Sequence, residues 1–127
     1  MYVVKGKILT LMGEIPVEKL KIDDLIVDRA GSTRRLLSIT KGKVDSVLHF
    51  QNNTLVVSAD SVVYTDKGAM KVTESTTLNV RKENNSTTTE RVRVVAEDTC
   101  GYSLEIEGGL DFFVNGYNFQ NGGAIND

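Results

Sequence analysis

Short stretches of alternating apolar and polar residues cover most of the chain, a pattern typical of β-strands that bury one face. β-Branched residues dominate the apolar set, glycine occurs 11 times and proline once, which favours many short strands over helices. Only residues 17–20, directly after Pro16, predict a helical turn. The predicted strands are residues 3–11, 25–29, 36–40, 46–51, 54–58, 62–65, 78–82, 90–96, 102–106 and 111–114.

Turn-forming residues separate these strands, for example at positions 41–42, 108–109 and 115–116. The polar segment 82–89 has nothing to bury, so we expect an exposed hairpin tip between two long strands. The chain has 127 residues and no internal repeat. It therefore predicts one all-β domain over residues 1–121, followed by a flexible tail over residues 122–127.

Composition and charge narrow the classes of partner. Hydrophobic residues make up 40% of the chain, enough for a core, and the net charge is −2. This charge argues against nucleic acid or an anionic membrane as a partner. The basic residues that come closest together are expected to form a solvated strand face: Arg34, Arg35, Lys41 and Lys43.

Targeting signals and metal-ligand sets are absent from the sequence. No apolar window approaches the ~18 residues of a membrane span, and no charged-then-apolar signal sequence opens the chain. We therefore expect a cytoplasmic protein or a part of a particle assembled inside the cell. One histidine and one cysteine make no ligand set, so we expect neither a metal nor a cofactor, and the single cysteine forms no internal disulfide.

Three separated blocks carry a family pattern. The first begins at Lys7-Ile8-Leu9-Thr10 and continues to Asp24 through Gly13 and Pro16-Val17-Glu18. The second covers residues 55–68 and the third covers residues 102–121. Together the blocks resemble the Hint (hedgehog/intein) domain family, in the family's order and at its spacing.

This resemblance implies a flattened horseshoe of curved, mostly antiparallel strands with pseudo-two-fold symmetry. In that fold the two chain ends lie together at the centre, where the residue at the N-terminal junction and a late Asn share a site. The family's reactive positions fall on Met1, Ser58, Ser61, Leu110, Gln120 and Asn121. Counting by the commoner glycine spacing moves the first of them from Met1 to Tyr2.

Of these positions, only Asn121 keeps the family's residue type. The family's first step needs Cys, Ser or Thr, because the attacking atom must sit on Cβ to close a five-membered ring. A Met thioether has no proton to lose, and a Tyr phenol oxygen lies too far from its own backbone. Ser58 can donate a hydrogen bond in place of the family Thr, but Ser61 cannot shuttle a proton as the family His does. Leu110 and Gln120 likewise stand where the family has histidines.

His49 and Cys100 are the remaining candidates. His49 falls in the strand predicted over residues 46–51, away from all three blocks, and we interpret it as an ordinary strand residue rather than a transplanted base. No His or Asp is linked by motif to Cys100, so we expect a small, partly buried core residue there. The acidic residues Asp23, Asp24 and Asp28 are interpreted as a charged strand entry.

These replacements favour a catalytically inactive Hint-fold protein. Its expected role is that of a structural or protein–protein interaction module, bound to a protein partner or to a second copy, within a larger assembly such as a viral particle. The alternative is a residual self-processing protein that cleaves slowly at Asn121. The pair Asn121-Gly122 is flexible and also permits succinimide formation without a catalyst.

Overall fold

A computed structural model describes residues 1–121, which form one continuous antiparallel sheet with two 3₁₀ turns. The strands are β1 (Val3–Lys5), β2 (Lys7–Thr10), β3 (Gly13–Pro16), β4 (Leu25–Val27), β5 (Thr33–Phe50), β6 (Leu55–Ser58), β7 (Val62–Thr65), β8 (Gly68–Lys71), β9 (Thr76–Arg81), β10 (Thr87–Ile106), β11 (Asp111–Val114) and β12 (Tyr117–Gln120). The 3₁₀ turns are η1 (Val17–Lys19) and η2 (Gln51–Asn53). The all-β prediction is confirmed. The expected tail, residues 122–127, lies outside the described residues.

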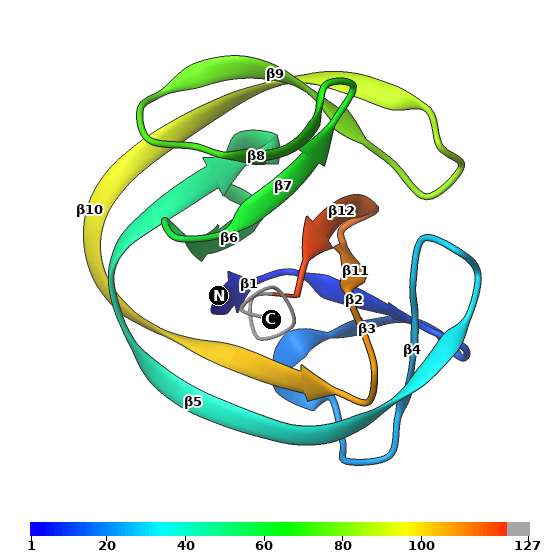
Figure 1. Ribbon diagram of the computed structural model, residues 1–127. Helices are drawn as coiled ribbons and strands as arrows, with labels where there is room; N and C mark the ends of the chain where they lie inside the picture. The colour runs from blue at the N-terminus through cyan, green and yellow to red at the C-terminus, as the bar shows by residue number, and fades with distance from the viewer. Residues whose placement is uncertain (122–127) are drawn as a thin grey trace.

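Two long strands, β5 and β10, set the shape of the molecule. They pair with each other from His49↔Arg93 to Leu36↔Ile106. The first residues of β5 pair with β4, the strand that precedes it in the chain. The first residues of β10 pair with β9 in the same way. Figure 1 shows the two strands as one curved band around the shorter strands. This repeated arrangement agrees with the expected horseshoe and its pseudo-two-fold symmetry.

The core lies inside this band. Its aromatic centre is Phe50, which meets the rings of Phe119 and Tyr117 edge-on at centroid distances of 5.6 and 6.1 Å. A smaller apolar cluster includes Val44, Val47 and Val56, against which Tyr2, Val4 and Val95 pack. Among the described residues, no helix has the length and apolarity needed to cross a bilayer.

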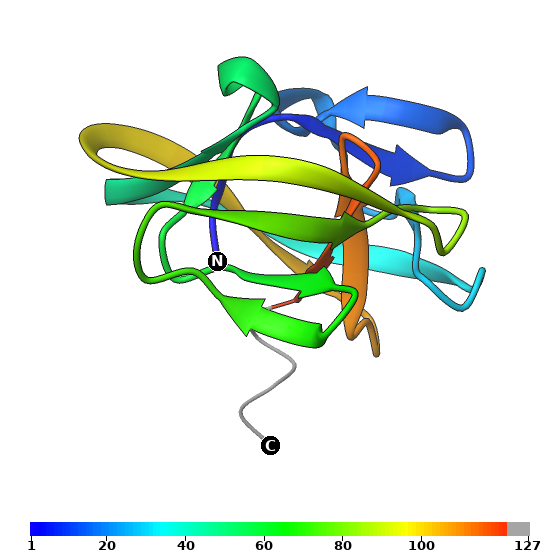
Figure 2. The ribbon, with the colours of Figure 1, turned by 90° about the horizontal axis from the view of Figure 1, so that it is seen from above.

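The N-terminal strand β1 is wedged into the middle of the sheet. Val3 pairs with Val57 of β6 on one side and with Tyr102 of β10 on the other. Gly6 lies between β1 and β2. A larger residue would not fit there, because a Cβ would lie 2.5 Å from Cγ1 of Val114. Residue 1 and the last described residues therefore both lie near the centre of the molecule in Figures 1 and 2.

Several predicted boundaries were wrong. The turn expected at Lys41-Gly42 lies inside β5, and the two strands predicted on either side of it are one strand. In the same way, the predicted strands 90–96 and 102–106 merge into β10. Three strands, β3, β8 and β12, were not predicted, because each is short and follows directly on a turn. The expected hairpin tip is shorter than predicted, since β10 already begins at Thr87.

Candidate functional site

The N-terminal segment lies against the middle block of the sequence pattern. The backbone N–H of Tyr2 donates to Oγ of Ser58 at 2.7 Å, and the N–H of Ser58 donates to the carbonyl of Tyr2 at 2.8 Å. The peptide bond that the middle block holds is therefore Met1–Tyr2. Of the two ways of counting back to the N-terminal position, this geometry favours the one that ends at Tyr2.

Ser58 also connects this peptide to a carboxylate. Its hydroxyl donates to Oδ1 of Asp60 at 2.5 Å, and the Met1 ammonium lies 3.5 Å from Oδ2 of the same residue. Burial raises the pKa of Asp60, but the hydrogen bond from Ser58 and the nearby ammonium outweigh it, so the pKa of Asp60 is lowered overall. The Ser58 proton is thus committed to Asp60, and its oxygen accepts the Tyr2 amide. Ser61 is fully buried, with its hydroxyl 3.5 Å from that of Ser58.

The Tyr2 side chain lies over a part of the two long strands where each strand has a glycine. Gly42 of β5 and Gly101 of β10 face each other across the ladder. A Cβ at Gly42 would lie 2.7 Å from Cε2 of Tyr2, and a Cβ at Gly101 would lie 2.9 Å from Cβ of Tyr2. The two glycines therefore form a slot for this side chain, which belongs to the smaller apolar cluster. Sequence reasoning missed the slot, although a glycine inside a strand often marks such a close approach.

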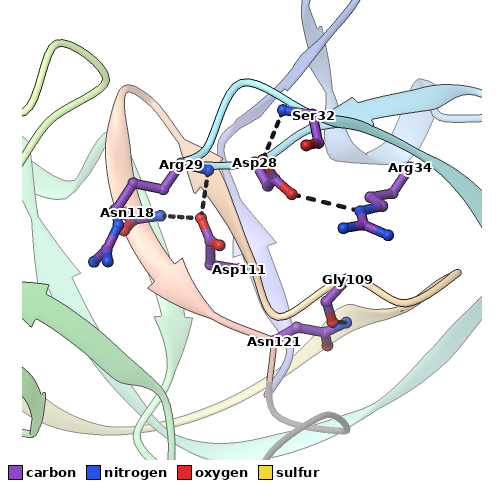
Figure 3. Close-up of polar contacts among 8 residues, drawn as sticks. All are labelled: Asp28, Arg29, Ser32, Arg34, Gly109, Asp111, Asn118 and Asn121. Atoms are coloured by element: carbon purple, nitrogen blue, oxygen red, sulfur yellow. Dashed lines mark hydrogen bonds and ion pairs between the residues drawn. The ribbon is translucent and has the colours of Figure 1, made fainter.

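The opposite end of the chain is held by a second set of contacts. Asn121 is only 7% exposed, its backbone N–H donates to the carbonyl of Leu110 at 2.8 Å, and its side-chain amide donates to the carbonyl of Gly109 at 3.3 Å. Figure 3 shows the Asn121 side chain turned toward Gly109. The side chain of Leu110 is 63% exposed, and Gln120 pairs with Asp111 at the end of β12.

Asp111 organises the hairpin that leads to Asn121, and the sequence patterns did not identify it. One oxygen of Asp111, Oδ2, accepts the backbone N–H of Arg29 and the side-chain amide of Asn118, both at 2.8 Å (Figure 3). Asn118 is fully buried and also donates to the carbonyl of Phe112 at 3.2 Å. A polar residue between Leu110 and Phe112, in an otherwise apolar run, was the available signal.

The nearby residues Tyr64 and Asp28 complete this end of the molecule. Burial and the Asp111 carboxylate raise the pKa of Tyr64, and the Arg29 guanidinium lies 5.2 Å from the centre of its ring. Asp28 was expected to be part of a charged strand entry, but it is buried. It closes the β4–β5 turn by accepting the N–H of Ser32 at 2.9 Å (Figure 3).

The predicted positions thus form two groups. Tyr2 and Ser58 line one groove of about 330 Å³, which Asp60 also lines. Leu110 and Asn121 line another groove, of about 530 Å³, together with Ser103 and Thr40. Both grooves are open to solvent, and their walls carry hydroxyls and amides.

Solved structures, but no sequence family, match this fold. No family model and no curated protein sequence matches the chain. The gp41-1 intein is 15% identical and matches with a TM-score of 0.75 over 94% of this chain and 98% of that chain. An intein-like domain from Clostridium thermocellum is 14% identical and matches with a TM-score of 0.77 over 95% and 99% of the two chains. For the MchDnaB-1 intein, also 14% identical, the TM-score is 0.70 over 95% and 100% of the two chains.

This chain has an intein-like Hint fold. The fold that the three sequence blocks predicted is confirmed. At identities of 14–15%, these matches show the fold and nothing further.

Within this Hint fold, two other predictions need correction. His49 does not lie away from all three blocks, because it pairs with Val56 of the middle block, and its Nε2 lies 3.1 Å from Oε1 of Glu97. Cys100 is exposed on β10 rather than partly buried, since it lies on the outward face of the long strand. Among residues 1–121, no group of three His, Cys, Asp or Glu side chains is placed to hold a metal ion.

Proposed function

We propose that this chain is a catalytically inactive Hint-fold protein that acts as a structural or protein–protein interaction module. Its partner is another protein or a second copy of itself, within a larger assembly such as a viral particle. The proposal assigns the family's N-terminal position to Tyr2, the residue whose amide binds Ser58.

The side chain at that position is the observation that carries the proposal. Attack on the preceding carbonyl needs a nucleophilic atom on Cβ, and the Tyr2 hydroxyl is at the far end of the ring. The ring lies against Gly42 and the Tyr2 Cβ lies against Gly101, so this side chain serves the packing of the sheet. Tyr2 therefore has a structural reason to be kept at a position where chemistry would need Cys, Ser or Thr.

Proton transfer at this peptide bond is also unsupported by the neighbouring residues. Ser61 and Ser58 offer hydroxyls, which do not titrate near neutral pH. The His49 ring contacts Glu97, with 3.1 Å between Nε2 and Oε1, and His49 lies in the ladder between β5 and β10. Losing one positioned acid–base group typically lowers a rate by about 10²–10⁴.

Intact-mass measurement tests this proposal. Purified protein is incubated at neutral pH for several days beside an Asn121→Ala variant, and we expect both masses to stay unchanged. Accumulation of a species that ends at Asn121 in the parent protein, but not in the variant, would overturn the proposal.

Slow processing at Asn121 is the second candidate, and one observation favours it. The Asn121 side chain is buried and held by Gly109, so it does not lose further rotamer freedom before attacking its own carbonyl. In that step the side-chain nitrogen would bond to the Asn121 carbonyl carbon, and the amine of Gly122 would leave with a proton. Gln120 cannot supply this proton, so Gln120→His should speed cleavage by about 10²–10⁴ if processing occurs. Equal, negligible cleavage in both proteins favours the inactive module.

A further inference from the structure

Three neighbouring strands expose aliphatic side chains on the outer face of the sheet. Thr10 of β2 pairs with Ile26 of β4, both buried. Leu11 is the next residue, and its N–H donates to the carbonyl of Leu25 at 2.9 Å. Side chains of neighbouring pairs point to alternate faces, so Leu11 and Leu25 share the outer face.

The same face continues on β5. Leu25 pairs with Arg35, and Leu37 follows two residues later on that face. Met12 in the β2–β3 turn and Ile22 in the segment before β4 are also exposed. We call the five residues together the Leu25 patch: Leu11, Met12, Ile22, Leu25 and Leu37. Their exposed fractions are 61, 88, 52, 38 and 37%. Figures 1 and 2 both place the β2–β3 hairpin and β4 at the same end of the molecule.

The fold itself does not explain these residues. Leu11 and Met12 occupy a hairpin tip, where Asn, Asp and Gly are the usual residues, and the positive φ of +103° that the turn needs is supplied by Gly13. A polar pair would serve the turn equally well. Contiguous exposed apolar surface on a small domain is typical of a binding site.

We propose that the Leu25 patch binds the same patch on a second copy of this chain. Five side chains with these exposures present on the order of 500 Å² of apolar surface, within the range of functional patches on monomers. Two such patches would bury about 1,000 Å² in total, near the lower limit for a specific interface. The expected complex is therefore a weak two-fold dimer.

The charges in the patch suit a two-fold contact. Arg35 lies beside Leu25 and is flanked by Asp23 at 3.5 Å and Glu107 at 3.2 Å. A face with adjacent opposite charges is complementary to itself when rotated by half a turn. The net charge of −2 over the whole chain opposes self-association only weakly.

This inference rests on the proposed role as an interaction module, and sedimentation velocity tests it. Over a range of about 10 μM to 1 mM, the average mass should rise from that of a monomer toward that of a dimer. Leu25→Ser should weaken this association about tenfold, as truncation at the centre of an interface does. Met12→Ser lies at the exposed tip, where it does not disturb folding, and should weaken it as well.

Leu110→Ser is the matched control, since Leu110 is 63% exposed but lies outside the patch, before β11. Its association should equal that of the parent chain. A monomer at every concentration, or equal effects of Leu25→Ser and Leu110→Ser, would each overturn the inference. Neither result would affect the inactivity proposed above, which self-cleavage in the mass measurement would overturn by itself.

Discussion

Tyr2 is held by hydrogen bonds of its backbone and by packing of its ring. Substituting Gly42, which lies against the ring, therefore tests how much this packing contributes to stability. A Cβ at Gly42 would lie between 2.7 and 2.9 Å from two ring carbons and the hydroxyl oxygen of Tyr2. Gly42→Ala should therefore destabilise the protein by about 1–3 kcal/mol, the usual effect of overpacking. Urea unfolding of the variant and the parent chain measures this difference.

The matched background for that measurement is Tyr2→Ala, which removes the ring. There the added methyl group at Gly42 meets open space, so the same substitution should be nearly neutral. The double-mutant cycle should give a coupling energy of about 1 kcal/mol or more. Equal effects of Gly42→Ala in both backgrounds would mean that Tyr2 is not the reason for the glycine.

Asp60 makes stability depend on pH at one residue. Its pKa in the folded protein is lowered below the ordinary Asp value of 3.8, because the hydrogen bond from Ser58 and the nearby Met1 ammonium outweigh burial. A lowered pKa stabilises the folded state above pH 3.8, and this contribution is lost as the pH falls through the folded-state pKa. Asp60→Asn should thus lower the unfolding free energy near pH 7, by less than about 1 kcal/mol since the side chain is 59% exposed. The deficit should shrink near pH 3, and a deficit of the same size at both pH values would contradict this origin.

At the scale of elements, the turn between β11 and β12 is anchored by one side chain. Asn115 and Gly116 have φ values of +50° and +82°, as in a two-residue hairpin turn. Oδ1 of Asn115 accepts the N–H of Lys7 at 2.7 Å, and Nδ2 donates to Gln51 and to the carbonyl of Thr54 at 3.1 and 3.2 Å. Asn115→Ala should therefore cost about 2–4 kcal/mol in unfolding free energy, through lost bonds and backbone strain.

Asn85 provides the control for this turn. It has a similar φ of +64°, but it lies in the exposed tip between β9 and β10. Asn85→Ala should show only the strain, about 1 kcal/mol. If the two substitutions have equal effects in urea unfolding, anchoring by the Asn115 side chain is not what stabilises the hairpin.

The sequence predicted which elements exist better than how far they extend. Strands β7 and β11 were predicted with their observed bounds, because alternation and flanking turn residues agree there. Gly42 was misread as a turn residue, since a sequence does not show that a distant ring will cover it. Gly101 escaped notice for the same reason, and β10 was divided near it. Local patterns do not contain contacts between residues far apart in the chain.

The candidate site, too, was predicted only in part from the sequence. The sequence blocks named Ser58, whose oxygen accepts the N–H of Tyr2, and Leu110, whose carbonyl accepts the N–H of Asn121. Ser61 lies beside Ser58, with 3.5 Å between the two hydroxyl oxygens. The second block also contains Asp60, two residues after Ser58, but Asp60 was not recognised as a site residue. The bond from Arg29 to Asp111 joins distant parts of the chain, which only the folded structure brings together.

At the scale of the whole molecule, the two long strands tie the halves of the chain together. Residues 1–84 include β5 and β9, while residues 85–127 include β10, which pairs with both. The connection between β9 and β10 is exposed over Glu83, Asn84, Asn85 and Ser86. A cut there removes one covalent link but leaves the paired strands in place.

A protease site placed in this tip should therefore give two fragments that stay together. We expect them to elute as one species under native conditions, with the same β-sheet circular dichroism as the uncut chain, and to separate only in denaturant. The cut should still lower stability in urea, because folding then also has to overcome the entropy of associating two chains. Fragments that separate without denaturant would mean that each half folds by itself, which is incompatible with a sheet in which β5 and β10 pair from Leu36 to His49.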